Sequence, residues 1–300
     1  VRTLQYETQG VFGSMCLVDD IESMVKANDY CNRYGTDTIS VGAACAYAIE
    51  CYENGLLTKE QTDGLELTWG NGEAMAELTR RICLRETWLG KLLADGTYRA
   101  TEVIPNSFEY AMQIGGEELP MHDQRLDHSL FLMYYAEPTP GRHTQGAISY
   151  TPPETPLPEE RGLAHKIGED WQHVIDACGF CLFINTFVLP FDSTREFLNA
   201  ACDREFTNDE LQAIGARISL LRHAFNHREG IKFTDRKVPK RLLEAPEADG
   251  PIKGSVIDKD TLVKEYIAAA QYDPTTLYPK KEVLQKYGLD FVIPDLYPNG

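Results

Sequence analysis

The spacing of apolar residues predicts helices along most of this chain. Apolar side chains stand at positions 41, 44, 45, 48, 49 and 52, which is the i, i+3, i+4, i+7 series of one buried helical face. Gly55 follows at the point where a glycine commonly ends a helix. The same periodicity predicts further helices at about 19–33, 71–84, 87–95, 162–177, 208–226, 260–271 and 280–287.

Capping residues support two of these helices. Thr207 and Glu210 have the spacing of a capping box, in which each side chain bonds a backbone amide at the start of the helix. Pro279 and Gly288 bracket the last helix, proline at its start and glycine after its end.

Signals for strands are sparse. Leu65–Trp69 and Glu118–Met121 have strand character, and each is too short to build a sheet alone. Residues 137–160 are rich in proline and glycine, so they cannot continue a flanking helix. We therefore predict a mostly α, multihelical fold with two helical lobes, 1–136 and 161–300, joined by the loop 137–160. A cleft between two lobes is a common place for a ligand.

Composition narrows the functional classes. The chain has 43% hydrophobic and 25% charged residues, as ordinary soluble globular proteins do. Its net charge of −17 argues against a nucleic-acid partner, because phosphate binding needs clustered lysine and arginine. No apolar run approaches the roughly 18 residues that span a bilayer, so no membrane partner is expected.

The cysteines and the first residues indicate where the protein works and what is missing. Most of the eight cysteines lie in apolar helical patterns, which fits buried thiols in a reducing, cytoplasmic compartment. The chain begins with Val1 and shows no signal-peptide pattern. These features suggest a fragment or a processed chain.

Two short segments share one form. Residues 32–37 (Asn-Arg-Tyr-Gly-Thr-Asp) and 176–181 (Asp-Ala-Cys-Gly-Phe-Cys) each place a glycine after a helix and an acidic residue or cysteine two positions later. Such a turn frees backbone amides, and a carboxylate beside it can accept bonds from the amino groups of a heterocycle. Taken alone, Gly35 reads as a helix C-cap and Asp37 as the N-cap of the next helix.

Cys178 and Cys181 form the one C-x-x-C pair in the sequence. A thioredoxin-like redox pair requires a βαβ setting, which the helical surroundings do not supply. Ligation of a metal or an iron–sulfur cluster requires further cysteines from elsewhere. Buried structural cysteine is the third alternative, and the residues themselves leave these readings open.

Collinear motifs over essentially the whole chain resemble the aldehyde:ferredoxin oxidoreductase family of tungsten- or molybdenum-pterin enzymes. No single motif is specific, and the resemblance rests on their order. The matching segments are Tyr6-Glu7-Thr8, Phe12-Gly13-Ser14, Asp19-Asp20, Ala27-Asn28, Asp37–Ser40, Gly116–Arg125, Phe225–Gly230 and Pro246–Gly254.

The resemblance implies cofactors. In the family, two D-x-x-G-L-(C/D) segments hold a pair of pterins that carry tungsten or molybdenum, and the final cysteine ligates a 4Fe–4S cluster. Asn32 replaces the first aspartate and Thr36 a leucine in one segment, and Phe180 replaces the leucine in the other. The implied pterin-binding residues are Gly35, Thr36, Asp37, Asp176, Gly179 and Phe180, with Cys181 as the cluster ligand.

The family's other three cluster cysteines form a C-x-x-C-x-x-x-C run, which this sequence does not contain. They lie upstream in the family, so we expect the chain to lack the N-terminal domain. Two catalytic residues are also implied. Glu7 matches a family glutamate close to the metal, and His143 falls in the loop where the family has a histidine.

The function that the resemblance implies is oxidation of small aldehydes to carboxylic acids, with electrons passing through the 4Fe–4S cluster to ferredoxin or a similar carrier. A homo-oligomer or an electron-transfer subunit is compatible with it. One alternative is a relative that reduces another substrate, such as an acyl-CoA thioester. A second alternative is a helical scaffold subunit that has lost its cofactors. Asn32 in place of the family's aspartate and the missing cysteines favour this alternative.

Overall fold

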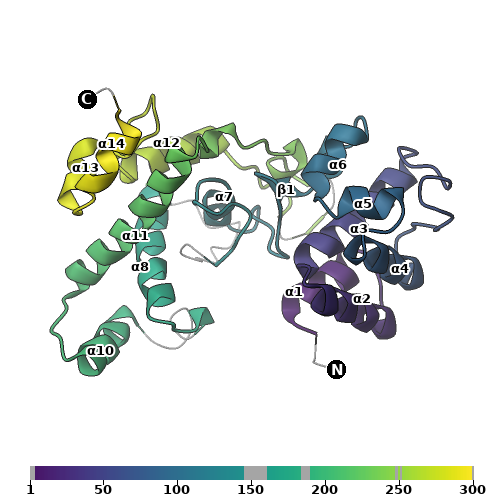
Figure 1. Cartoon of the computed structure of the whole chain (residues 1–300), viewed down its shortest axis with the longest axis horizontal. Coiled ribbons are helices and arrows are strands. Elements are labelled where there is room, and N and C mark those ends of the chain that lie inside the picture. Colours follow the sequence, from purple (N-terminus) through teal and green to yellow (C-terminus); the bar gives the residue numbers. More distant parts are fainter. Residues whose placement is uncertain (1–3, 145–160, 184–189, 247–248, 251, 299–300) are drawn as a thin grey trace. The chain divides into compact units, whose positions relative to one another are not determined.

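The computed structural model describes residues 4–144, 161–183, 190–246, 249–250 and 252–298, and it is built mainly of helices (Figure 1). The one sheet within these residues is a hairpin of β1 (Gln113–Ile114) and β2 (Glu117–Glu118), paired antiparallel. The prediction of a mostly α, multihelical fold is confirmed. None of the described helices combines the length and apolar character needed to cross a membrane.

The chain forms two compact units, which we describe separately. Unit 1 comprises residues 1–122 and 237–242, and unit 2 comprises residues 123–236 and 243–300. The lobes 1–136 and 161–300 stay a prediction of domain organisation. Most of the predicted loop, residues 145–160, lies outside the described residues.

Helix α3 is the centre of unit 1. It contacts α1, α2, α4 and α6, and its buried residues run almost without interruption from Val41 to Cys51. Small residues fill much of this stretch, including Gly42 and Cys45, so the neighbouring helices can approach closely. The helices of unit 1 are α1 (Tyr6–Gln9), a π-helical turn (Gly10–Ser14), α2 (Ile21–Tyr34), α3 (Thr38–Glu53), α4 (Gly72–Cys83), α5 (Trp88–Leu93) and α6 (Thr97–Val103).

Helix α8 is the centre of unit 2, where it packs against α11 and α12 (Figure 1). Two glycines allow this packing: a Cβ on Gly215 would lie 1.8 Å from the carbonyl oxygen of Asp170, and one on Gly162 would lie 2.3 Å from the backbone of Glu265. The helices of unit 2 are α7 (His128–Tyr135), α8 (Arg161–Ala177), α10 (Phe191–Cys202), α11 (Asn208–Arg228), α12 (Lys259–Ala269), α13 (Lys281–Lys286) and α14 (Ile293–Leu296).

The interior of unit 2 is polar. Burial raises the pKa of Glu137 well above its usual range, and the neighbouring Glu169 carboxylate adds to that effect. Burial opposes ionisation of Glu169 as well, but the Lys166 ammonium and nearby histidines hold its pKa well below the usual range. Burial lowers the pKa of His165 to about 4 and that of His223 to about 3, so both imidazoles are neutral near pH 7.

One predicted strand is wrong. Residues 65–69 form no strand, because side chains satisfy their backbone carbonyls: Thr62 donates to the Leu65 oxygen (2.8 Å) and Asn71 to the Glu66 oxygen (3.0 Å). Of the predicted strand at 118–121, β2 includes only Glu118. Helices α1, α6, α7, α10 and α14 were not predicted. The capping box is present, because the Thr207 hydroxyl accepts from the Glu210 amide and the Glu210 carboxylate accepts from the Thr207 amide.

Candidate functional site: two glycine turns and a glutamate–histidine pair

The first glycine turn ends α2. Gly35 has φ +70°, in the left-handed region that favours glycine, and the amide of Thr36 donates to the Cys31 carbonyl (3.0 Å). Asp37 stands at the N-cap position of α3, but its carboxylate accepts a hydrogen bond from the Ser40 hydroxyl (3.2 Å) and caps no backbone amide. The turn therefore leaves an exposed carboxylate at the start of α3.

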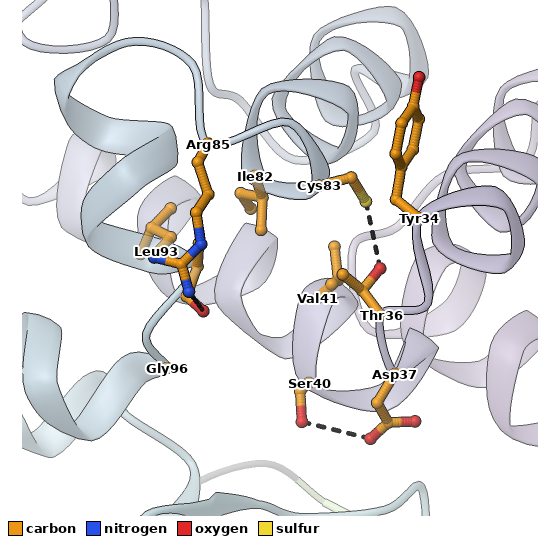
Figure 2. Close-up of a pocket in the computed structure, with 11 residues that line it drawn as sticks. Tyr34, Thr36, Asp37, Ser40, Val41, Ile82, Cys83, Arg85, Leu93 and Gly96 are labelled. Carbon is orange, nitrogen blue, oxygen red and sulfur yellow. Dashed lines mark hydrogen bonds between the residues drawn. The ribbon is translucent and has the colours of Figure 1, made fainter.

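A cavity of about 340 Å³ lies beside this turn (Figure 2). Thr36, Asp37 and Ser40 line one side of it, and Ile82 and Leu93 supply apolar wall. Its mixture of a few hydrogen-bonding groups with apolar wall is typical of a small-molecule site. The implied binding residues Gly35, Thr36 and Asp37 thus lie at or next to a cavity in unit 1.

A cysteine that sequence analysis did not single out also lines this cavity. The Cys83 sulfur lies 3.2 Å from the Thr36 hydroxyl (Figure 2). A hydrogen bond with the Cys31 thiol, with help from Thr36, lowers the pKa of Cys83 to about 7. The same bond is the main cause that raises the pKa of Cys31. A sequence signal was available, because Cys83 closes the predicted helix 71–84, but no motif marked it.

The second glycine turn ends α8 in unit 2 with the same backbone geometry. Gly179 has φ +72°, and the amide of Phe180 donates to the Ile175 carbonyl (3.2 Å). The Asp176 carboxylate accepts a hydrogen bond from the Gln172 amide group (2.8 Å). Each turn therefore uses the amide after its glycine to close the helix. That amide is engaged, contrary to the expectation that such a turn frees it.

The two cysteines of the C-x-x-C pair differ in environment. Cys178 is half-buried against Trp171, Val174 and Leu211, and burial raises its pKa. Cys181 is exposed. An accessible thiol suits a ligand and a packed thiol does not, so the geometry is compatible with a ligand role for Cys181 alone, which stays a prediction.

Glu7 is held in a defined position in unit 1. Its Oε2 accepts a hydrogen bond from the Met121 amide (2.8 Å), and its Oε1 lies 3.0 Å from Nε2 of His122. Only 19% of the Glu7 side chain and 20% of the His122 side chain are exposed. The Tyr6 ring lies over His122 with 5.3 Å between centroids, and its hydroxyl donates to the Met121 carbonyl.

His122 is the partner that sequence analysis missed. The signal was its place directly after Met121, inside the matching segment Gly116–Arg125. His143, the implied second catalytic residue, is half-buried and belongs to unit 2, in the segment after α7. Glu7 and His143 thus come from different units, and their joint role stays a prediction.

Comparisons with known proteins agree on one family. The family model described as aldehyde ferredoxin oxidoreductase, domains 2 and 3, matches residues 1–289. A tungsten-containing aldehyde ferredoxin oxidoreductase of Pyrococcus abyssi is 33% identical over 298 residues, which cover 95% of this chain and 48% of that protein. A protein of Pyrococcus furiosus named aliphatic sulfonate oxidoreductase, WOR-like subunit, is 31% identical over 300 residues, covering 95% and 45%.

A solved structure shares the fold. It is the active site complex BamBC of benzoyl coenzyme A reductase with 1,5-dienoyl-CoA, which matches with a TM-score of 0.76 and 21% identity over 96% of this chain and 49% of that chain. This chain therefore spans about half the length of the relatives and of the structure that it matches.

Proposed function

Because this chain belongs to the aldehyde ferredoxin oxidoreductase family, we propose that it is part of an enzyme that oxidises aldehydes to carboxylic acids. The reaction would take place at a tungsten or molybdenum bis-pterin centre and pass electrons through a 4Fe–4S cluster to ferredoxin. One observation supports this above the others: an exposed carboxylate, Asp37 or Asp176, stands beside each of the two turns that match the family motif. The turns themselves have the ordinary geometry of a helix C-cap, which Gly55, Gly230 and Gly288 share.

The residues at the turns fit a pterin. Asp37 and Asp176 are exposed carboxylates at the two turns, and carboxylates accept hydrogen bonds from the amino groups of a pterin ring. The cavity beside Thr36 gives the first half of the cofactor a wall of mixed polarity. Because the amides of Thr36 and Phe180 already close their helices, these carboxylates would be the main recognition groups.

The described residues can supply only part of the ligands of an iron–sulfur cluster. A 4Fe–4S cluster takes about four thiolates. Cys181 is exposed and can supply one of them, but four other cysteines, Cys16, Cys31, Cys45 and Cys51, are buried in unit 1. Cys178 packs against apolar side chains. Cys83 and the exposed Cys202 lie outside the segment 176–181 that matches the family motif. We therefore infer that Cys181 is a cluster ligand and that the remaining ligands would come from elsewhere.

Glu7 and His122 have the arrangement of an acid–base pair. A bound tungsten bis-pterin would supply the acceptor for the two electrons that leave when an aldehyde hydrate becomes a carboxylic acid. Two protons leave with them. The Met121 amide fixes Oε2 of Glu7, so the carboxylate cannot rotate freely, and Oε1 with His122 can take up a proton. His143 would polarise the substrate oxygen from unit 2.

Replacement of Glu7 by glutamine in the full-length protein tests this proposal. Tungsten or molybdenum, pterin and iron contents should stay unchanged, because glutamine keeps the size and a carbonyl acceptor for the Met121 amide. Turnover with aldehydes and a viologen acceptor should fall about 10²-fold or more, the usual scale for loss of a positioned acid or base. Glu102→Gln, at an exposed position of α6, is the matched control and should keep full activity.

The wild-type protein separates the alternatives. A scaffold subunit would contain neither tungsten, molybdenum nor iron, and that result would end the proposal. A sulfonate oxidoreductase, as the Pyrococcus furiosus relative is named, would turn over a sulfonate and not an aldehyde. A reductase would consume electrons from a reduced viologen in the presence of an acyl-CoA thioester. Activity in Glu7→Gln at the wild-type rate would remove Glu7 from the chemistry.

A further inference from the structure

Three ligand-type side chains meet in the interior of unit 2, and none of them belongs to the candidate functional site. Glu137 follows the end of α7, and His165 and Glu169 stand four residues apart on one face of α8. All three side chains are 0% exposed. One ligand atom from each lies within 4.8 Å of the other two, a spacing that a single metal ion can bridge.

Two atoms of this cluster are unsatisfied. Oε2 of Glu137 and Nδ1 of His165 are fully buried and have no hydrogen-bond partner. Buried polar atoms almost always have partners in native proteins, and an orphaned carboxylate oxygen points to a missing ion or water. Because Oε2 accepts no hydrogen bond from the protein, it is available to a ligand held by the three side chains.

The spacing of the ligand atoms is compatible with one shared ion. Oε1 of Glu137 lies 3.0 Å from Nε2 of His165. Two ligands that are each about 2.1 Å from one ion, at a right angle, stand about 3.0 Å apart. The same histidine and Glu169 have the i, i+4 spacing at which helical residues reach a common point.

The charges also leave room for a cation. Glu137, Glu169 and Asp170 are three buried carboxyl groups, and the Lys166 ammonium is the cation that contacts them, bonding Asp170 and lying 3.3 Å from Oε2 of Glu169. The Arg236 guanidinium donates to the main-chain carbonyl of Glu137 (2.8 Å) and not to its carboxyl group. The Arg222 guanidinium, the other one close by, bonds the Thr139 hydroxyl (2.8 Å). Within the described residues, no ammonium or guanidinium group hydrogen-bonds the Glu137 carboxyl group.

We propose that Glu137, His165 and Glu169 bind one divalent first-row transition cation that ties the end of α7 to α8. One imidazole and two carboxylates form a mixed nitrogen–oxygen donor set, which suits Mn²⁺, Fe²⁺ or Zn²⁺. Ser219 and Tyr266 donate to the Glu169 carboxylate and hold it in place. The site is separate from both glycine turns and does not depend on the proposed function.

Metal analysis of the full-length protein as isolated from cells tests the site. The wild type should contain about one more manganese, iron or zinc ion per chain than Glu137→Gln, which loses a charged ligand but keeps size and hydrogen bonding. The matched control is His227→Gln on α11. His227 is also buried, and neither of its ring nitrogens has a hydrogen-bond partner, but it belongs to no such cluster among the residues that the structure describes. Its metal content should equal that of the wild type.

A second measurement does not depend on folding of any variant. Anomalous difference maps from wild-type crystals, collected at the manganese, iron and zinc absorption edges, should show one peak about 2.1 Å from Glu137 and His165. A protein whose cluster binds only a proton or a water molecule would give no peak. That result, or equal metal content in wild type and Glu137→Gln, would overturn the proposal.

Discussion

The two units bury different chemistry around their central helices. In unit 1, α3 itself consists largely of small apolar residues and thiols, and the interior around it contains no buried ion pair among the described residues. In unit 2, α8 turns its charged face inward: His165, Lys166, Glu169 and Asp170 are buried, and Leu163 and Ile167 are 42% and 48% exposed. Helix α3 is thus packed closely because its residues are small, whereas α8 is packed with charged side chains that compensate one another.

This difference predicts which substitutions destabilise each unit most. An apolar interior loses stability in proportion to the volume or contacts removed. A buried ionic network loses more when one member is removed, because the remaining charges have neither water nor a partner. We therefore expect substitutions in the α8 network to be more damaging than substitutions around α3.

The largest effect should come from Lys166→Met. The ammonium bonds Asp170 and Ser219 and lies 3.3 Å from Glu169, so its loss leaves buried carboxyl groups uncompensated. We expect unit 2 to lose about 3–5 kcal/mol of stability, the scale for breaking a buried ion pair from one side. Hydrogen exchange followed by mass spectrometry should show lost protection in peptides of α8 and unchanged protection in α3.

The control for this prediction is Lys264→Met. Lys264 is exposed on α12, so its replacement should change stability by less than about 0.5 kcal/mol. Equal protection in α8 for Lys166→Met and Lys264→Met would show that the Lys166 contacts do not stabilise unit 2, and the contrast between the two interiors would fail.

A pair of glycine substitutions sharpens the comparison at a smaller scale. A Cβ on Gly215 would lie 1.8 Å from the backbone oxygen of Asp170, whereas one on Gly42 would lie 2.5 Å from a side-chain methyl of Val11. Backbone cannot move aside without shifting α8 against α11, but a side chain can. We expect Gly215→Ala to cost roughly 3 kcal/mol and Gly42→Ala about 1 kcal/mol, within the usual range for overpacking. Thermal unfolding measures both; the reverse order would contradict the packing argument.

Much of the fold could be predicted from the sequence, because hydrophobic periodicity and helix-capping residues are local features of the chain. The helices predicted at 71–84 and 208–226 differ from α4 and α11 by at most two residues at either end. Helix α7 was missed because almost every residue in it is apolar and buried, so no period separates its faces. The prediction of a strand at 65–69 was wrong because the side chains of Thr62 and Asn71 donate hydrogen bonds to backbone carbonyls of this segment. The hydrophobic pattern of the sequence does not reveal such bonds.

The candidate site could be predicted only in part. The residues of the glycine turns were accessible through the family resemblance. The contact between Glu7 and His122 joins residues 115 positions apart, and the Glu137 cluster joins α8 to the first residue of the proline-rich segment 137–160. The sequence analysis assigned no orientation to the polar residues of α8, and polar side chains usually face solvent. Only tertiary packing shows that they face inward.

The smallest expected effect is the pH dependence of a thiol's reactivity. It distinguishes the interiors of the two units without a change in the free energy of unfolding. In unit 2 burial moves the pKa of His165 to about 4, so this histidine does not titrate near neutrality. In unit 1 the hydrogen bond from Cys31 lowers the pKa of Cys83 to about 7, and Cys83 lines the cavity beside Thr36. Since the thiolate is the reactive form, alkylation of Cys83 should accelerate as pH rises through about 7.

Alkylation by iodoacetamide, followed peptide by peptide in the cofactor-free chain, measures this. The Cys83 rate should rise roughly tenfold between pH 6 and 8 and then level off, whereas a thiol with a pKa near 9 would still be rising steeply. Cys45, whose pKa burial raises to about 12, is the internal control and should stay unreactive. Cys31→Ala should move the Cys83 curve to higher pH, because it removes the donor that stabilises the thiolate. If the pH dependence of Cys83 alkylation is the same in that variant as in the wild type, the hydrogen bond between Cys31 and Cys83 does not set the reactivity of Cys83.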